Sequence, residues 1–257
     1  MAQWLAQLPY TTLEAALASG KPVVAILPVG ATESHGPHLP LNTDVVISEA
    51  FAELAADRLE ADGGVVPFIL PSLAYTPAGY ASPFTGTISL GWEVAKQTLM
   101  EIGANLKRQG FASLAIANSH FDPANVNILR QASDELEAQG LPVAFADATR
   151  RKLAAQLSEE FQSGDCHGGQ FETSIVLAAK PELVDQALLK GLPAREVGLI
   201  NAIQSQGSDA NFQSVGMDAS YCGNPAGASA SEGMTSISTL ADALVQAIVA
   251  KVLSTES

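Results

Sequence analysis

The residues of this chain that could carry chemistry are concentrated in one short segment. Residues 27–44 (LPVGATESHGPHLPLNTD) hold two of the chain's four histidines between a pair of carboxylates. Glu33 precedes His35 by two positions, and in an extended loop such residues project to the same side. Imidazole offered together with carboxylate suits Zn²⁺, Mn²⁺, Fe²⁺ or Co²⁺ and argues against Ca²⁺ or Mg²⁺ alone. Asp44, which ends the segment, is a carboxylate able to bridge two such ions.

The remaining two histidines also have acidic neighbours. Asp122 follows His120 by two positions, and Glu172 follows His167 by five. Together with the first segment, these pairs predict a site for two divalent metal ions. The candidate metal ligands are Glu33, His35, Asp44, His120, Asp122 and Glu172.

Three of the four acidic candidates also have a structural alternative. Asp44 could cap a helix that starts at residue 45, and Asp122, directly before Pro123, is equally suited to capping a helix. Glu172 could be a first-turn glutamate that the helix dipole favours. The metal hypothesis therefore depends on these residues lying together in the fold.

The pattern along the chain predicts an α/β fold of one domain, residues 1–257. Short aliphatic runs alternate with segments of helical period, which is typical of parallel βα units. The expected strands are 23–29, 65–71, 111–118 and 141–147. The expected helices are 45–62, 92–110, 123–140, 149–161, 169–179 and 235–253.

The expected strands explain why the histidines should meet. In open parallel sheets, ligands bind beyond the carboxyl ends of the strands. His35 follows strand 23–29 and His120 follows strand 111–118. Two segments rich in Gly, Ser, Asn and Pro, 72–91 and 196–233, do not fit the βα rhythm. Long connections of this kind are usually functional loops or disorder, and we expect these two to line the substrate pocket.

Composition restricts the partners. The chain has 257 residues, with 13 Lys and Arg against 27 Asp and Glu, a net charge of −14. Such a charge repels phosphate backbones and anionic lipids, so we expect no nucleic-acid partner and no membrane. Cys166 and Cys222 form no CxxC motif and the N-terminus shows no signal-peptide pattern, so we expect reduced thiols and a cytoplasmic location.

Five sequence blocks resemble a known family. PVGATESHGPHLPLNTD resembles the signature P-x-G-[AS]-x-E-x-H-G-x-H-L-P-x-x-T-D of the creatininase (creatinine amidohydrolase) family. SPFTGTISL, NSHFDPAN, HGGQFETS and YCGNPAGASASEG are similar to later family blocks and follow in the same order. The resemblance implies a three-layer α/β/α fold with a mostly parallel central sheet. It also implies a homo-oligomer, often a hexamer, with a two-metal amidohydrolase site.

The resemblance also assigns the candidate ligands. Glu33, Asp44 and His120 would hold one ion, and His35 and Asp44 would hold the other. The last ligand of the second ion is either Asp122 or Glu172, and both remain candidates. His38 either orients a ligand carboxylate or has a purely structural role in its loop.

The implied reaction is hydrolysis of a non-peptide C–N bond in a small amide, either linear or cyclic. A hydroxide that bridges the two ions would attack the carbonyl carbon. His167 is the expected proton donor to the leaving nitrogen, and Glu172 or Asp122 the acceptor of the water proton. The chain has only two tryptophans, Trp4 and Trp92, so it lacks the tryptophan lid of creatininase, which argues against creatinine as substrate. The alternatives are a metal- or small-molecule-binding protein without turnover, and a deformylase acting on a formamide.

Overall fold

The centre of the fold is a four-stranded parallel sheet in the order β2-β1-β3-β4. The structure is a computed structural model that describes residues 2–207 and 210–253. The strands are β1 (Val23–Val29), β2 (Val66–Ile69), β3 (Ser113–Asn118) and β4 (Val143–Phe145). All seven residues of β1 are buried, as expected for a central parallel strand covered on both faces. The four predicted strands are confirmed, and the last three are shorter than expected.

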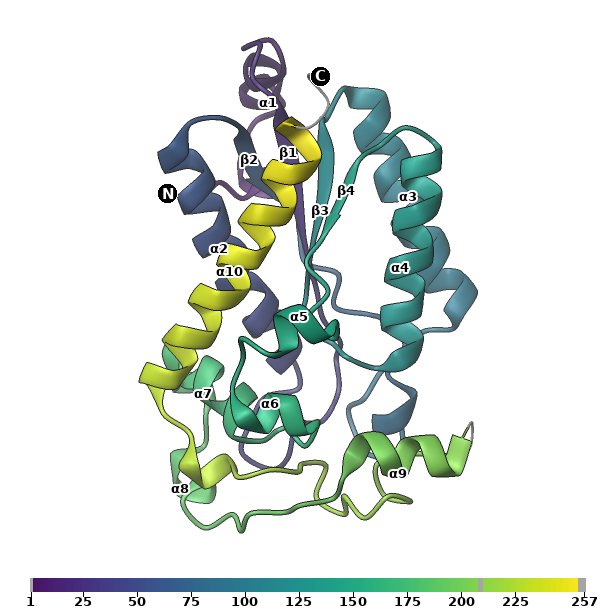
Figure 1. The fold of residues 1–257 in the computed structure, drawn as a ribbon, viewed down its shortest axis with the longest axis vertical. Helices are drawn as coiled ribbons and strands as arrows, with labels where there is room; N and C mark the ends of the chain where they lie inside the picture. The colour runs from purple at the N-terminus through teal and green to yellow at the C-terminus, as the bar shows by residue number, and fades with distance from the viewer. Residues whose placement is uncertain (1, 208–209, 254–257) are drawn as a thin grey trace.

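Helices cover both faces of the sheet. Alternate β1 residues point to opposite sides: Val24 and Ile26 pack with α2, α7 and α10, whereas Val23 and Ala25 pack with α3 and α4. Figure 1 shows the strands between these two helical layers. The predicted three-layer α/β/α architecture is therefore confirmed. The larger helices are α2 (Thr43–Asp62), α3 (Trp92–Gln109), α4 (Pro123–Ala138), α7 (Gln170–Ala179) and α10 (Ala230–Leu253).

The shorter helices gather beyond the carboxyl ends of the strands, in the lower half of Figure 1. An exception is α1, near the N-terminus. The short α-helices are α1 (Tyr10–Leu17), α5 (Arg151–Ala154), α6 (Glu159–Ser163), α8 (Gln186–Leu189) and α9 (Leu199–Gln206). The 3₁₀ helices are η1 (Leu5–Gln7), η2 (Gly79–Ala81), η3 (Pro181–Leu183) and η5 (Pro225–Gly227).

Two of the predictions for this region are wrong. The single helix expected over 149–161 is broken into α5 and α6, because Ser158 starts a new helix by accepting a hydrogen bond from the Phe161 N–H. The segment 196–233, expected to be a loop, contains α9 and the start of α10. Residues 208–209 of that segment lie outside the described residues.

Helix α10 is long and apolar enough, by length and composition alone, to cross a membrane. In this fold its apolar residues have another role: Ile237, Leu244 and Ile248 are at most 4 % exposed and belong to the core shared with α2 and α7. Core helices pass the same test of length and composition. The packing of α10 in this core accounts for its apolar composition.

Candidate metal centre and substrate pocket

Strand β1 and helix α2 approach each other closely where the site lies. A Cβ added to Gly30, directly after β1, would come 2.6 Å from the Val45 nitrogen and 2.8 Å from the Asp44 Cβ. Only glycine fits this approach without displacing backbone. Asp44, in the first turn of α2, is thereby held beside the strand end, and its Oδ2 accepts a hydrogen bond from the Ala31 N–H. Asp44 does not cap its own helix, since the N-cap residue is Asn42.

Asp44 lies at the centre of the cluster. Its Oδ1 is 3.2 Å from His35 Nε2, and its Oδ2 is 3.0 Å from His120 Nδ1. Glu33 Oε1 lies 3.1 Å from the same His120 nitrogen, and Glu172 Oε2 lies 3.5 Å from His35 Nε2. The two carboxylate oxygens of Asp44 thus face two different sets of neighbours, as a bridging carboxylate would.

Backbone carbonyls orient three histidines in the same way. His35 Nδ1 donates to the Glu33 carbonyl, His120 Nε2 to the Pro77 carbonyl, and His167 Nε2 to the Ser34 carbonyl. A carbonyl oxygen only accepts, so each of these nitrogens carries the proton. The other ring nitrogen faces the cluster and can bind a metal ion once the ion displaces the proton there, which is the arrangement that metal-binding histidines require.

Burial makes the cluster dependent on cations. Glu33, Asp44 and Glu172 are at most 3 % exposed. Their ion pairs among the described residues are with histidines alone. His35 Nε2 is buried without a hydrogen-bond partner in the part of the chain that the structure describes. Buried charges are normally paired or coordinate metals, so the donor set fits divalent ions.

Burial and the neighbouring charges also shift the pKa values of the cluster residues. Burial disfavours the charged form of His35, but Asp44 and Glu172 outweigh it and raise the pKa of His35 to about 10. Burial raises the pKa of Glu172 to about 8. Protons occupy these groups at neutral pH when no other cation is available, and metal ions bind such ligands by displacing protons.

Glu172, and not Asp122, belongs to a group of close ligand atoms among the described residues. Among the described residues, three groups have ligand atoms within 4.8 Å of one another: Glu33–Asp44–His120, His35–Asp44–Glu172 and Glu33–His35–His167. Glu172 lies in the first turn of α7 and accepts from the Gly168 N–H. Asp122 caps α4 by accepting from the Ala124 N–H, as its structural alternative predicted, and only lines the nearby pocket.

His38 lies beside the cluster without touching its carboxylates. It is 1 % exposed, and its Nε2 is 2.9 Å from the Thr173 hydroxyl oxygen. Burial, followed by the charge of His35, lowers the pKa of His38 to about 4. Of its two predicted roles, this contact supports the structural one, in which His38 joins its loop to α7.

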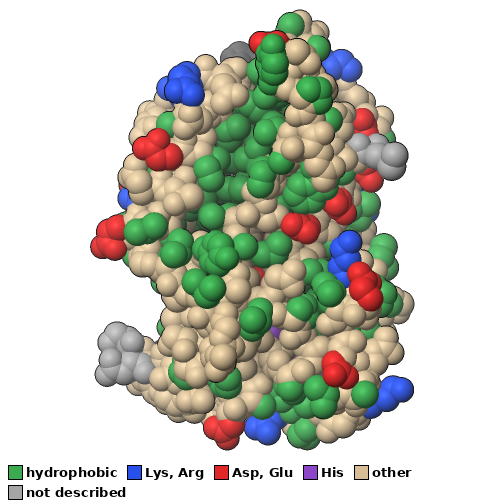
Figure 2. All heavy atoms as spheres, turned by 180° about the vertical axis from the view of Figure 1, so that it is seen from behind, with side chains coloured by type: hydrophobic (Ala, Val, Ile, Leu, Met, Phe, Trp, Pro, Cys, Tyr) green, Lys and Arg blue, Asp and Glu red, His purple; other side chains and the backbone are tan. Residues whose placement is uncertain are grey.

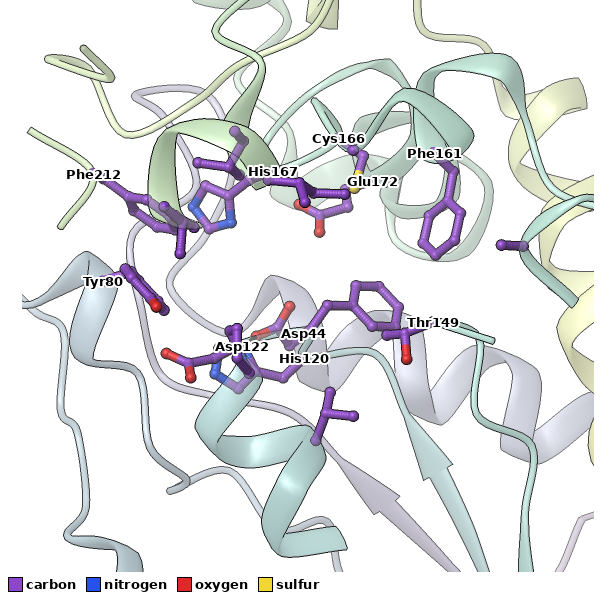
Figure 3. A pocket seen from close by; sticks show the side chains of 18 of the residues that line it. Asp44, Tyr80, His120, Asp122, Thr149, Phe161, Cys166, His167, Glu172 and Phe212 are labelled. Atoms are coloured by element: carbon purple, nitrogen blue, oxygen red, sulfur yellow. Dashed lines mark ion pairs between the residues drawn. The ribbon is translucent and has the colours of Figure 1, made fainter. Parts of the chain in front are cut away.

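A pocket of about 440 Å³ opens onto the cluster. Its walls are mainly apolar and aromatic and include Tyr80, Phe121, Val126, Phe161, Leu199 and Phe212. Figure 3 shows Tyr80 and Phe212 on one side of Asp44 and His120, and Phe161 and Thr149 on the other. The pocket therefore extends to both sides of the cluster. All four histidines are at most 8 % exposed, and the face in Figure 2 shows almost no histidine surface among its many apolar side chains.

Part of this lining follows from the sequence. Tyr80 lies in segment 72–91, and Leu199 and Phe212 lie in segment 196–233, both of which were expected to line the pocket. Phe161 and Arg130 also line it, but no sequence pattern pointed to them. Both lie on helices, and the residues that a helical side chain contacts are known only when the position of the helix in the fold is known.

Three comparisons with known proteins agree with this geometry. The sequence matches the model of the family Creatininase, described as creatinine amidohydrolase, over residues 6–248. It is 31% identical over 229 residues to a mycofactocin precursor peptide peptidase of Mycobacterium ulcerans (strain Agy99), covering 87% of this chain and 83% of the relative. It is 31% identical over 198 residues to a creatinine amidohydrolase of Pseudomonas putida, covering 71% and 74%. A crystal structure of creatinine amidohydrolase (creatininase) superposes with a TM-score of 0.73 at 25% identity, over 98% of both chains.

Proposed function

We propose that this chain, which belongs to the creatininase family of hydrolases, hydrolyses an amide C–N bond with the help of two divalent metal ions. One observation carries the proposal. Two groups of buried ligand atoms, Glu33–Asp44–His120 and His35–Asp44–Glu172, share Asp44 at the carboxyl ends of β1 and β3. Two adjacent groups joined by one carboxylate are suited to two ions, and a single ion would leave one group of buried charges without a counter-charge.

The protein's part in the reaction is to hold the ligands and move protons. Glu33, Asp44 and His120 would hold one ion, and His35, Asp44 and Glu172 the other. Imidazole with carboxylate accepts Zn²⁺, Mn²⁺ or Fe²⁺. When bound, such ions lower the pKa of water and polarise a carbonyl oxygen.

We assign the proton transfer to His167. Its Nε2 donates to the Ser34 carbonyl, and its Nδ1 lies 3.9 Å from Glu33 Oε1. Burial and the charge of His35 lower the pKa of His167 to about 4, so the ring is neutral at pH 7. A neutral Nδ1 first accepts a proton from the attacking water and then gives it to the leaving nitrogen. This refines the sequence-based role of His167 as proton donor, while Glu172 is assigned to metal binding.

The substrate we propose is an amide other than creatinine. Pockets of about 300–1,000 Å³ hold drug-sized ligands, and this one of about 440 Å³ is large for one small ring. No tryptophan is among the described residues that line it. A short peptide is the second candidate, favoured by the 31% identical relative that is named a peptide peptidase. The homo-oligomer and the cytoplasmic location stay predictions.

Metal removal and reconstitution test the proposal. The purified protein would be stripped with a chelator, reloaded with Zn²⁺, Mn²⁺ or Fe²⁺, and assayed on lactams, hydantoins, formamides, creatinine and short acylated amides. We expect two ions per chain and turnover only after reloading. His120→Ala should lose metal and turnover together. A stripped protein that still hydrolyses the panel, or a loaded one with two ions and no turnover on it, would contradict the proposed function and favour a binding protein.

A further inference from the structure

Arg130 is a cation in the wall of a mainly apolar and aromatic pocket. It lies on α4 and is the one Lys or Arg among the described residues that line the pocket. Its Nε and Nη2 donate to Asp147 Oδ2 at 2.9 and 2.7 Å, and Nη2 also donates to the Thr149 hydroxyl at 2.8 Å. These bonds fix the guanidinium plane. Preorganised guanidinium groups bind carboxylates well because little side-chain entropy remains to be lost.

Arg130 also has hydrogen-bonding capacity and positive charge beyond what Asp147 and Thr149 use. Within residues 2–207 and 210–253, no hydrogen bond is made by its Nη1. Its partner Asp147 also accepts from Arg150 Nε at 3.1 Å. One carboxylate is thus shared by two guanidinium groups, and this three-residue group has a net charge of +1. The Arg130 side chain is 33% exposed, so a ligand in the pocket can reach it.

The position of Arg130 within the pocket follows from its partner. Thr149, which accepts the Arg130 hydrogen bond, lies on the same side of Asp44 and His120 as Phe161 (Figure 3). On this side the wall is apolar, since Phe161 packs edge-on to Phe121 with ring centroids 5.2 Å apart. Tyr80 and Phe212 form the opposite side. One half of the pocket therefore combines an aromatic wall with a guanidinium group.

We propose that the substrate is an amide whose one half carries an apolar group and a carboxylate, with the carboxylate bound by Arg130 and the apolar group against Phe121 and Phe161. An acylated apolar amino acid has this chemistry. The inference rests on the proposed amide hydrolase activity. Water adds across the C–N bond: the acyl carbon gains the oxygen and leaves as a carboxylate, and the nitrogen gains the proton and leaves as the amine of the amino acid.

Matched substrates and variants test this assignment. The substrates are N-acetylphenylalanine, its neutral isostere N-acetylphenylalaninamide, and N-acetylglycine, with release of acetate as the measure. The proteins are wild type, Arg130→Gln, Arg130→Lys and Arg150→Gln. Arg150 is the matched control, because it binds the same Asp147 oxygen but is not among the residues that line the pocket.

The expected result is a preference that depends on Arg130. Charge-assisted hydrogen bonds to Arg are worth about tenfold or more in affinity. Wild type should therefore prefer the free acid over its amide by about tenfold in kcat/KM. Arg130→Gln should abolish this preference by raising KM for the acid alone. Arg130→Lys should keep part of it, and Arg150→Gln should keep most of it, because that change lowers the charge of the group but leaves the N–H donors of Arg130 in the pocket. N-acetylglycine should be the poorer acid, because it has no group for the aromatic wall.

A binding measurement separates this inference from the proposed function. Calorimetric titration of each compound into metal-stripped and metal-loaded protein reads the carboxylate preference without turnover. Equal affinity for acid and amide in wild type, or the same preference in Arg130→Gln, overturns the role of Arg130 even if the amides are hydrolysed. Preferential binding of the acid, lost in Arg130→Gln, supports it even if none of the amides is hydrolysed, in which case the proposed activity alone fails. If Arg130→Gln does not fold, the wild-type pair and Arg130→Lys decide.

Discussion

The metal cluster and the outer wall of the pocket are built in different ways. The cluster uses side chains that directly follow β1 and β3 or lie in the first turns of α2 and α7, all of them nearly inaccessible. Its histidines are each fixed by a backbone carbonyl. The outer wall consists of α9 and Phe212; Ile200 in α9 is 52% exposed although it lines the pocket.

Asp165 anchors the start of the outer wall. Its Oδ2 accepts from the Val197 and Gly198 N–H groups at 2.7 and 2.9 Å, and its Oδ1 accepts from the Leu199 N–H at 2.7 Å. Asp165 is itself two residues from His167. The difference implies that changes in the cluster abolish turnover, whereas changes in the wall mainly alter substrate affinity.

Asp44→Asn should produce the largest effect. The amide keeps the size of the side chain and an acceptor for the Ala31 N–H, but it removes the negative charge between the two ligand groups. Since bound metal supplies several kcal/mol of catalysis, we expect kcat/KM to fall about 10³-fold or more. Elemental analysis should show fewer than two ions per chain.

The matched control for this variant is Asp242→Asn. Asp242 pairs with Arg58 at the surface, and losing an exposed pair costs about 1 kcal/mol or less. Its metal content and kcat should match those of wild type. An Asp44→Asn protein with two ions and normal kcat would show that the cluster is not the reaction centre, and the comparison of the two regions would break.

Asp165→Ala should have an intermediate effect, on the wall alone. It removes the acceptor for three backbone N–H groups before and at the start of α9. Hydrogen bonds to charged groups contribute about 1.5–3 kcal/mol each, partly replaced by water here, so we expect the free energy of unfolding to fall by about 2–3 kcal/mol. KM should rise about tenfold as the wall loosens, with kcat within about threefold of wild type.

Asp185→Ala is the control for helix capping as such. Asp185 accepts from the Ala187 and Leu188 N–H groups at the start of α8, which does not line the pocket. Its loss should lower the free energy of unfolding measured in urea but leave KM unchanged. If Asp165→Ala lowered kcat as much as Asp44→Asn and left KM unchanged, the wall would belong to the reaction centre.

The sequence predicted the cluster better than the wall for a physical reason. His35 and His120 follow strands whose aliphatic runs are easily recognised, and parallel strand ends meet at one edge. Their neighbours in space therefore follow from the order of the elements. The choice between Asp122 and Glu172 could not be made, since it depends on how α7 packs against the β1 loop. The two elements are far apart in the sequence, so their distance in space cannot be read from it.

The sequence pointed less clearly to the outer wall and to Arg130. Helix α9 has only eight residues (LINAIQSQ), too few for a helical period to stand out from the Gly- and Ser-rich segment around it. Arg130 lies on a correctly predicted helix, but its sequence does not distinguish it from any other surface cation. Its role depends on Asp147 and Thr149, which belong to the connection between β4 and α5.

The smallest expected effect concerns His38, which shares the His35 loop but serves its structure. Its pKa of about 4 in the folded protein lies below the ordinary value of 6.5. Between these values the unfolded chain takes up a proton that the folded protein does not. The contribution to stability is therefore complete above pH 6.5 and is lost as the pH falls toward 4, by at most about 1.4 kcal/mol per pH unit.

His38→Gln should remove this dependence while leaving turnover at pH 7 within about twofold of wild type, because glutamine can still bond the Thr173 hydroxyl. Urea unfolding of both metal-free proteins at pH 7, 6 and 5 measures this pH dependence. The contributions of the other histidines cancel when the two unfolding free energies are subtracted. The unfolding free energy of wild type minus that of the variant should fall by about 1 kcal/mol between pH 6 and 5. Parallel pH profiles would mean that His38 titrates like an exposed histidine, and a large loss of kcat would move it from the supporting loop into the cluster.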